Sequence, residues 1–156
     1  MQNERWPMDD FYDADPEAPG KMYSRWAGLI DNIKDFDCDF FGISKREAQS
    51  MDPQQRLLLE VAWETLERGG YNPQGLMGDN HGIFVGVGSN EYMQSGQISH
   101  ADLNGHTGTG NAGSVNAGRL SYVLGWHGPS MAVDTACSSS LVSLHLACQS
   151  LRNGEC

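Results

Sequence analysis

The amino-acid sequence predicts an α/β fold, because short apolar runs typical of strands alternate with amphipathic helical segments. The run "GIFVGVG" at Gly82–Gly88 is apolar and bounded by glycines, as in a buried strand. The segment "PSMAVDTA" at Pro129–Ala136 alternates apolar and polar residues, and we expect a central buried strand at Val133–Ala136. Helical patterns precede the first strand, separate the two strands and follow the second.

The strongest helical signal is "MDPQQRLLLEVAWETLERGG" at residues 51–70. Asp52 suits the N-cap and Pro53 the first helical position, while Gln55 has the spacing of a capping box. The helix should end at a glycine pair, Gly69 and Gly70. Its apolar stripe, which should face the core, consists of Leu59, Ala62, Trp63 and Leu66.

Two further helices are expected, one from about Asn111 to Gly125 and one from Ser138 to about Arg152. The last helix carries one apolar face, which we expect to pack against the core: Leu141, Leu144, His145, Cys148 and Leu151. Residues 1–27 and 89–107 are polar without a period and are predicted as loops. The patch "FDCDFFGIS" at Phe36–Ser44 should dock through its aromatic side chains.

Composition narrows the class of protein. A formal net charge of −10 argues against nucleic acid or an acidic membrane surface as a partner. No apolar run is long enough to span a bilayer, and the polar N-terminus does not read as a signal peptide. The four cysteines show neither CxxC pairs nor zinc-ligand spacing, so we expect a protein of the reducing cytoplasm without a metal. The length of 156 residues suits one domain, at residues 1–156, with a modest core.

Cys137 is the candidate catalytic residue, although a free cysteine is often only a buried packing residue. It lies where the second strand meets the last helix, a turn that presents nucleophiles. Helix N-terminal N–H groups stabilise a thiolate and can bind a developing oxyanion. The three serines Ser138–Ser140 are suited to capping the helix.

No histidine is placed beside this cysteine by local geometry. His145 lies about 12 Å along the same helix, at 1.5 Å per residue. His127 precedes the strand and lies at its far end, and His106 is a loop histidine that nothing local would tune. A cysteine-protease interpretation therefore lacks its base.

Two other motifs suggest different sites. Asp35, Asp37 and Asp39 alternate as in a calcium loop, but Phe40 occupies the position that needs glycine. "GTGNAG" at Gly108–Gly113 is a literal GxGxxG, and a dinucleotide-binding module is the best rival to cysteine chemistry. Because no buried strand precedes it, close helix packing is the favoured interpretation of these glycines.

The segment "VDTACSSSLVSLHLACQSLRNGEC" at 133–156 closely resembles the active-site segment of β-ketoacyl synthases, specifically the ketosynthase domains of modular type I polyketide synthases. "FFGISKREAQSMDPQQRLLLEVAWETLERGGY" at 40–71 is similar to their second signature. "GNAGSVNAGRLSYVLGWHGPSMAVDTACSSS" at 110–140 joins the two in the family's order, and residues 5–37 fit the family's early region.

This resemblance implies a thiolase-like fold with layers in the order α-β-α-β-α, of which the chain is part of the N-terminal half. It implies that Cys137 accepts an acyl chain from the phosphopantetheine thiol of an acyl carrier protein. Decarboxylative Claisen condensation with a malonyl-type extender then follows, and no cofactor is bound directly. Only Cys137 matches a catalytic position of the family, and its backbone N–H would be one oxyanion donor.

The resemblance places the family's two catalytic histidines in segments beyond Cys156. It places the family's opening strand before Arg5. The chain is therefore expected to be an internal fragment that is inactive alone, and its parent a homodimer with the strand before Cys137 near the two-fold axis. A non-catalytic ketosynthase-like piece that serves only in docking or dimerisation is a further alternative.

Overall fold

The computed structural model describes residues 7–94, 101 and 103–156 and divides the chain into two compact units, Met1–Asn32 and Ile33–Cys156. In the described part of the first unit, the short helix α1 (Met8–Phe11) is followed by a bridge between Tyr12 and Met22. The guanidinium of Arg25 lies 3.9 Å above the ring of Tyr12. Apart from α1, the described part of residues 1–27 is loop, as predicted.

The second unit holds the predicted α/β elements. Before the first strand come α2 (Lys45–Ser50), α3 (Pro53–Arg68) and the 3-10 helix η1 (Pro73–Leu76). Strand β1 (Ile83–Gly86) leads through α4 (Gly105–Asn111) and α5 (Val115–Leu124) to strand β2 (Ser130–Val133). The chain then passes through the 3-10 helix η3 (Ala136–Ser138) into α6 (Ser139–Arg152).

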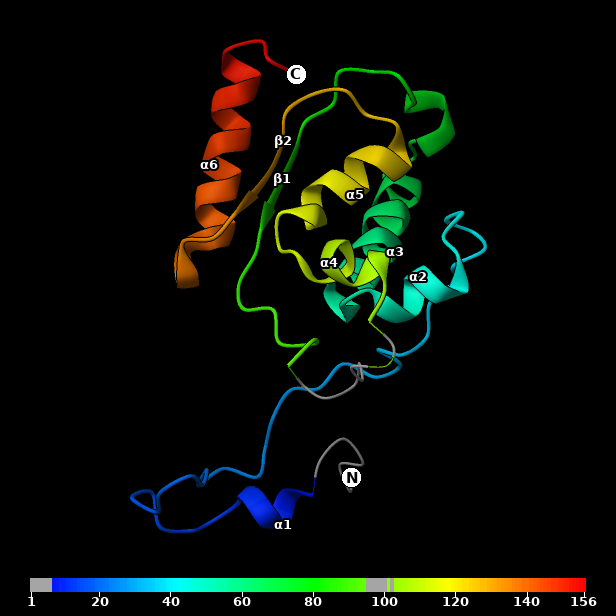
Figure 1. Ribbon diagram of the computed structural model, residues 1–156. Helices are drawn as coiled ribbons and strands as arrows, with labels where there is room; N and C mark the ends of the chain where they lie inside the picture. The colour runs from blue at the N-terminus through cyan, green and yellow to red at the C-terminus, as the bar shows by residue number, and fades with distance from the viewer. Residues whose placement is uncertain (1–6, 95–100, 102) are drawn as a thin grey trace. The chain divides into compact units, whose positions relative to one another are not determined.

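The two strands pair in parallel, with Ile83 opposite Ser130 and Gly86 opposite Val133. Parallel strands need a crossover connection, which α4 and α5 supply here. Helix α6 packs on one face of this pair and α5 on the other, so the strands form the middle layer (Figure 1). Both strands therefore end at the same side, where η3 and the start of α6 follow.

The hydrophobic core lies between α5, α3 and β1. Its buried members are Ile43, Ala48, Met51, Leu59, Ile83, Ala117, Leu120 and Leu124. The predicted patch at Phe36–Ser44 docks as expected, since Phe36 stacks on Phe41 and the ring of Phe40 lies edge-on to Trp63.

Helix α3 confirms most of its prediction. Its N-cap is Asp52, whose side chain accepts a hydrogen bond from the backbone of Gln54, and Pro53 opens the helix. The capping box is wrong, because the side chain of Gln55 is buried and donates to the backbone oxygen of Thr109 at 3.0 Å. The side-chain amide of Gln55 therefore bonds to α4 and not to the N-terminus of its own helix.

Three predicted boundaries also need correction. The helix expected from about Asn111 to Gly125 begins later, as α5 at Val115. Helix α4 was not predicted, and it begins inside the segment 89–107 that was expected to be a loop. Residues 95–100 and 102 of that segment lie outside the described residues. Strand β2 ends at Val133, so the residues that follow form a turn and not the expected strand Val133–Ala136. Within this chain the residues of β2 are exposed or half-buried, so the expected burial of the strand is wrong as well.

Helix α6 has the predicted extent, but the side of the helix that is buried is not the apolar side predicted from the sequence. Its buried side chains are the serines Ser139, Ser143 and Ser150, and these small residues let the helix lie close to β1. Leu141, Leu144 and Leu151 are exposed, and His145 with them. The apolar face predicted to pack therefore makes no core within the described part of this chain.

Candidate active site

Cys137 lies at the junction that the sequence predicted. Strand β2 ends four residues before it at Val133, and α6 begins two residues after it at Ser139. The residue sits inside η3 and is exposed. In Figure 1 this junction is at the lower end of α6, where the orange trace leaves β2.

The residue before the cysteine has an unusual backbone. Ala136 has φ 54°, in the left-handed region that L-residues rarely adopt. Such a conformation costs roughly 1–2 kcal/mol for a residue with a β-carbon, so the surrounding structure must hold it in place. This turn directs the chain from the strand into α6 and places Cys137 on its outer side.

Side chains on both sides of the turn bond to its backbone. The carboxylate of Asp134 accepts from the N–H of Ala136 at 3.0 Å. The hydroxyl of Ser138 donates to the backbone oxygen of Thr135 at 2.8 Å, and its Oγ lies 2.9 Å from the Thr135 Oγ1. The Ser139 hydroxyl accepts from the N–H of Thr135 at 2.9 Å and donates to the oxygen of Ala136 at 2.8 Å.

These contacts correct the role expected for Ser138–Ser140. Ser138 occupies the N-cap of α6, yet its side chain accepts no capping hydrogen bond from the helix. Ser138 and Ser139 instead bond back onto the turn that precedes them. The serine run stabilises the strand-to-helix junction itself, which the motif alone did not reveal.

The surroundings of Cys137 fit a nucleophile. No described residue accepts a hydrogen bond from its backbone N–H, which is therefore available to an incoming oxyanion. The three other cysteines, Cys38, Cys148 and Cys156, are half-buried. Cys137 is thus the one cysteine of the chain that is openly presented, and it lies beside the N-terminus of a 14-residue helix.

Among the residues that the structure describes, no histidine is placed as a general base beside Cys137. No histidine in the described ranges is hydrogen-bonded to Cys137. His106 lies 3.8 Å from the carboxylate of Glu47, and the ring of His81 packs against Trp126. His145, predicted to be packed, is exposed on α6. The described part of the chain therefore offers a thiol and N–H donors, but no histidine placed as a base for this thiol.

The glycine motif at Gly108–Gly113 does not have the geometry of a dinucleotide site. Gly108 and Gly110 lie inside α4, and Gly113 follows the helix end. A phosphate-binding fingerprint needs these glycines at the turn between a strand and a helix, so the dinucleotide alternative is wrong. Gly110 instead lets α4 approach the backbone of Ser50 and Met51 closely, which is the packing role that the sequence favoured.

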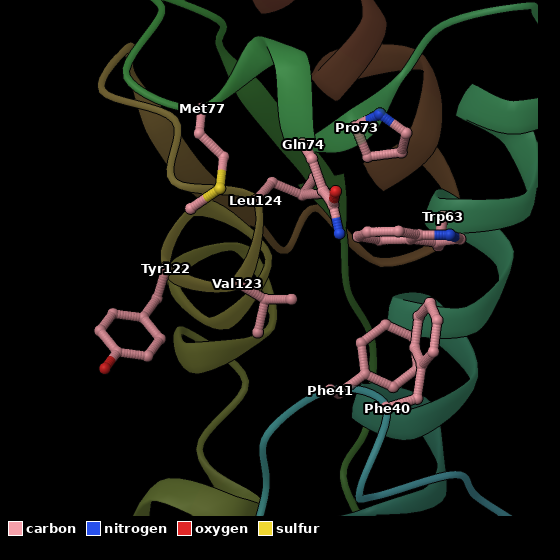
Figure 2. Close-up of a pocket in the computed structure, with 9 residues that line it drawn as sticks. All are labelled: Phe40, Phe41, Trp63, Pro73, Gln74, Met77, Tyr122, Val123 and Leu124. Atoms are coloured by element: carbon pink, nitrogen blue, oxygen red, sulfur yellow. The ribbon is translucent and has the colours of Figure 1, made fainter.

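A pocket lined mostly by apolar side chains lies elsewhere in the second unit. Figure 2 shows Phe40, Phe41 and Trp63 grouped on one side of it and Met77 and Tyr122 on the other. The remaining lining residues are Pro73, Gln74, Val123 and Leu124. No carboxylate, histidine or cysteine lines this pocket, and Cys137 is not part of it. The pocket therefore has no group suited to nucleophilic or acid–base catalysis.

Comparison with known proteins decides what kind of domain this is. Residues 1–156 match the profile described as "Beta-ketoacyl synthase, N-terminal domain". The chain belongs to the β-ketoacyl synthase family. It is 52% identical over 99% of its length to the pikromycin polyketide synthase component PikAII of Streptomyces venezuelae. It is also 52% identical over 97% of its length to the polyketide synthase GfsB of Streptomyces halstedii.

A solved ketosynthase confirms the thiolase-like fold. The Streptomyces albus JA3453 oxazolomycin ketosynthase domain OzmH KS7 aligns over 100% of this chain with a TM-score of 0.87 and 39% identity. This chain spans 27% of that solved chain, 4% of the pikromycin synthase component and 3% of GfsB. The ketosynthase family inferred from the motif around Cys137 is therefore confirmed.

Proposed function

We propose that this chain is the nucleophile-bearing part of a polyketide synthase ketosynthase, and that Cys137 is the residue that carries the growing acyl chain. The observation that supports this most directly is the position of Cys137, which is exposed between β2 and α6. No described residue accepts a hydrogen bond from its backbone N–H. The relatives are polyketide synthases, which supports the same class of reaction.

The proposed reaction has two stages. The Cys137 thiolate attacks the carbonyl of an acyl thioester on the phosphopantetheine of a carrier protein, and the oxyanion that forms is bound by the Cys137 N–H. The carrier thiolate leaves and takes up a proton, which gives an acyl-cysteine. A malonyl-type carrier thioester then loses CO₂, and its carbanion attacks the acyl-cysteine and expels the Cys137 thiolate.

The residues that assist decarboxylation are proposed to be the family's two histidines, which the resemblance places beyond Cys156. We propose that the chain alone is therefore inactive and that the acyl carrier protein is its partner in the intact domain. No helix among the described residues is long and apolar enough to cross a membrane. All four cysteines are free, which supports a reducing, cytoplasmic location.

We also propose that the intact domain is a homodimer. The sheet of the described residues has two strands, so the outer edge of β2 is unpaired and can extend a sheet. A molar mass of one protomer for the full-length domain, measured by light scattering at micromolar concentration, would contradict this part of the proposal.

The experiment uses a full-length ketosynthase domain that carries this sequence, with acyl thioester and malonyl-carrier as substrates. Cys137→Ala should reduce the condensation product to background, because the thioester intermediate cannot form. Cys148→Ala, which alters a half-buried cysteine on α6, is the matched control and should retain activity. Unchanged condensation in Cys137→Ala would overturn the proposal and favour a docking or dimerisation role.

A further inference from the structure

We propose that Ser139 is a positioning residue for Cys137, because its hydroxyl holds Ala136 in the left-handed conformation that sets the cysteine at the end of the strand. This inference rests on the proposed function of Cys137. Ser139 itself does not touch the reacting atoms. It acts through the backbone of the turn that carries them.

The hydroxyl ties the backbone on both sides of the strained residue. It accepts from the N–H of Thr135 at 2.9 Å and donates to the carbonyl of Ala136 at 2.8 Å. One side-chain hydroxyl therefore spans the residue with φ 54°. Without it, the Thr135 N–H loses its partner and the Ala136 carbonyl keeps only the backbone N–H of Ser139, so the left-handed conformation of Ala136 is held less firmly.

Burial strengthens the hydrogen bonds of Ser139 relative to those of the other side chains that bond to the turn. Ser139 is 6% exposed, so water competes little for its hydrogen bonds. Asp134 and Ser138 also bond to the turn, but both are exposed. Of these three side chains, Ser139 is the one that combines burial with bonds on both sides of Ala136.

A second buried serine on α6 supplies a control. Ser143, one turn further along α6, donates to the backbone oxygen of Ser139 at 2.8 Å, and its side chain is also buried. Because Ser143 belongs to the same buried face but does not reach the turn, it separates the effect of the clamp from that of a lost buried hydroxyl.

The test compares two residues of nearly the same shape at position 139 of the full-length domain. Ser139→Thr keeps the hydroxyl and Ser139→Val replaces it with a methyl group, so any steric cost is shared. The rate of acyl transfer to Cys137 should fall at least about tenfold in Ser139→Val, or about 1.4 kcal/mol of barrier. Ser139→Thr should remain within about threefold of the unmodified domain, and KM for the carrier should be unchanged in both.

Two further variants guard against a purely structural effect. Ser139→Ala should lose activity as the valine variant does, whereas Ser143→Ala should remain within about twofold. Adding Ala136→Gly to Ser139→Ala should recover part of the lost rate, because glycine adopts the left-handed conformation without a penalty. Equal rates in the threonine and valine variants, or an equal loss in Ser143→Ala, would overturn the proposal.

A readout independent of catalysis distinguishes this inference from the proposed function. The amide proton of Thr135 donates to the Ser139 hydroxyl, so it should exchange with solvent at least about tenfold faster in Ser139→Val than in Ser139→Thr. Equal exchange would contradict the clamp. If the unmodified domain is not acylated at Cys137, the proposed function fails while exchange still decides whether Ser139 holds the turn.

Discussion

The backbone of Gly86 lies directly against the backbone of Ser140, at the place where β1 ends and α6 begins. A β-carbon added to Gly86 would lie 2.8 Å from the nitrogen of Ser140 and 2.9 Å from the carbonyl carbon of Ser139. The obstacle is main chain, which cannot rotate aside as a side chain does. This close approach fixes the start of α6 beside the strand and so fixes Cys137.

Gly86→Ala should therefore destabilise the domain by about 1–3 kcal/mol, the usual cost of forcing an extra methyl group into a packed site. Acyl transfer to Cys137 should fall as well, because the start of α6 must move. Gly88→Ala is the matched control, since a β-carbon there meets nothing within 4 Å. Thermal and denaturant unfolding measure the first effect, and equal stability of the two variants would refute it.

The glycine motif gives a second matched pair within one helix. A β-carbon on Gly110 would collide with the backbone oxygen of Ser50, whereas one on Gly108 meets nothing within 4 Å. Gly110→Ala should destabilise by about 2 kcal/mol. Gly108→Ala should be neutral or stabilise by about 0.5–1 kcal/mol, because alanine favours helix. Denaturant unfolding distinguishes them, and a neutral Gly110→Ala would contradict the packing role.

The same motif shows what the sequence can and cannot reveal. The glycines at Gly108–Gly113 predicted close packing of a helix, which Gly110 confirms. The sequence did not reveal which helix they belong to, because the break between α4 and α5 follows no proline and no change in composition. Asn104 caps α4 with a capping box through Thr107, a pattern hidden in a segment without apolar periodicity.

A largely buried ion pair offers a third prediction. The Arg119 guanidinium donates to the Glu47 carboxylate at 2.6 Å and to the Gln55 side-chain oxygen at 2.8 Å, which joins α5 to α2 and α3. Arg119→Met removes the guanidinium from both acceptors and should cost roughly 3 kcal/mol. Arg68→Ala is the control, because it removes the exposed partner of Glu64. It should change the free energy of unfolding by less than about 0.5 kcal/mol.

Unfolding of the two arginine variants by guanidinium chloride measures this difference. Arg119→Lys should recover only part of the loss, because one ammonium group does not reproduce the two-sided guanidinium geometry. A stability of Arg119→Met within about 0.5 kcal/mol of the parent would show that the pair contributes nothing net.

The exposed leucines of α6 lead to a fourth prediction. In the layered fold of the family, we expect this face to be covered by a further layer of the intact domain. Leu144→Ala should then cost the full-length domain about 2–4 kcal/mol, as for a buried leucine. Leu144 is 60% exposed within this chain, so a loss below about 0.5 kcal/mol would show that the face stays uncovered.

The 156-residue chain alone should associate in solution, because it exposes this leucine face and unpaired strand edges. Light scattering measures this directly. A stable monomer with a cooperative unfolding transition would contradict the expectation that the chain is part of a larger folded unit.

Helix α6 also shows why part of the site was beyond sequence reasoning. Its length and the position of Cys137 before it followed from the strand pattern and the helical period. Its orientation did not, because the periodic leucines marked an apolar face without saying what covers it. The buried face is made of serines, whose small size and hydroxyl bonds to the turn carry no periodic hydrophobic signal.

The most direct test of the role of Cys137 is to locate the acyl group by mass spectrometry. A full-length domain that carries this sequence is incubated with acyl-carrier thioester in the absence of extender, and its peptides are mapped for the added acyl mass. We expect one acylated peptide, with the acyl group on Cys137, and no acylation after Cys137→Ala. An acyl group on Cys38, Cys148 or Cys156, or acylation that persists in Cys137→Ala, would contradict it.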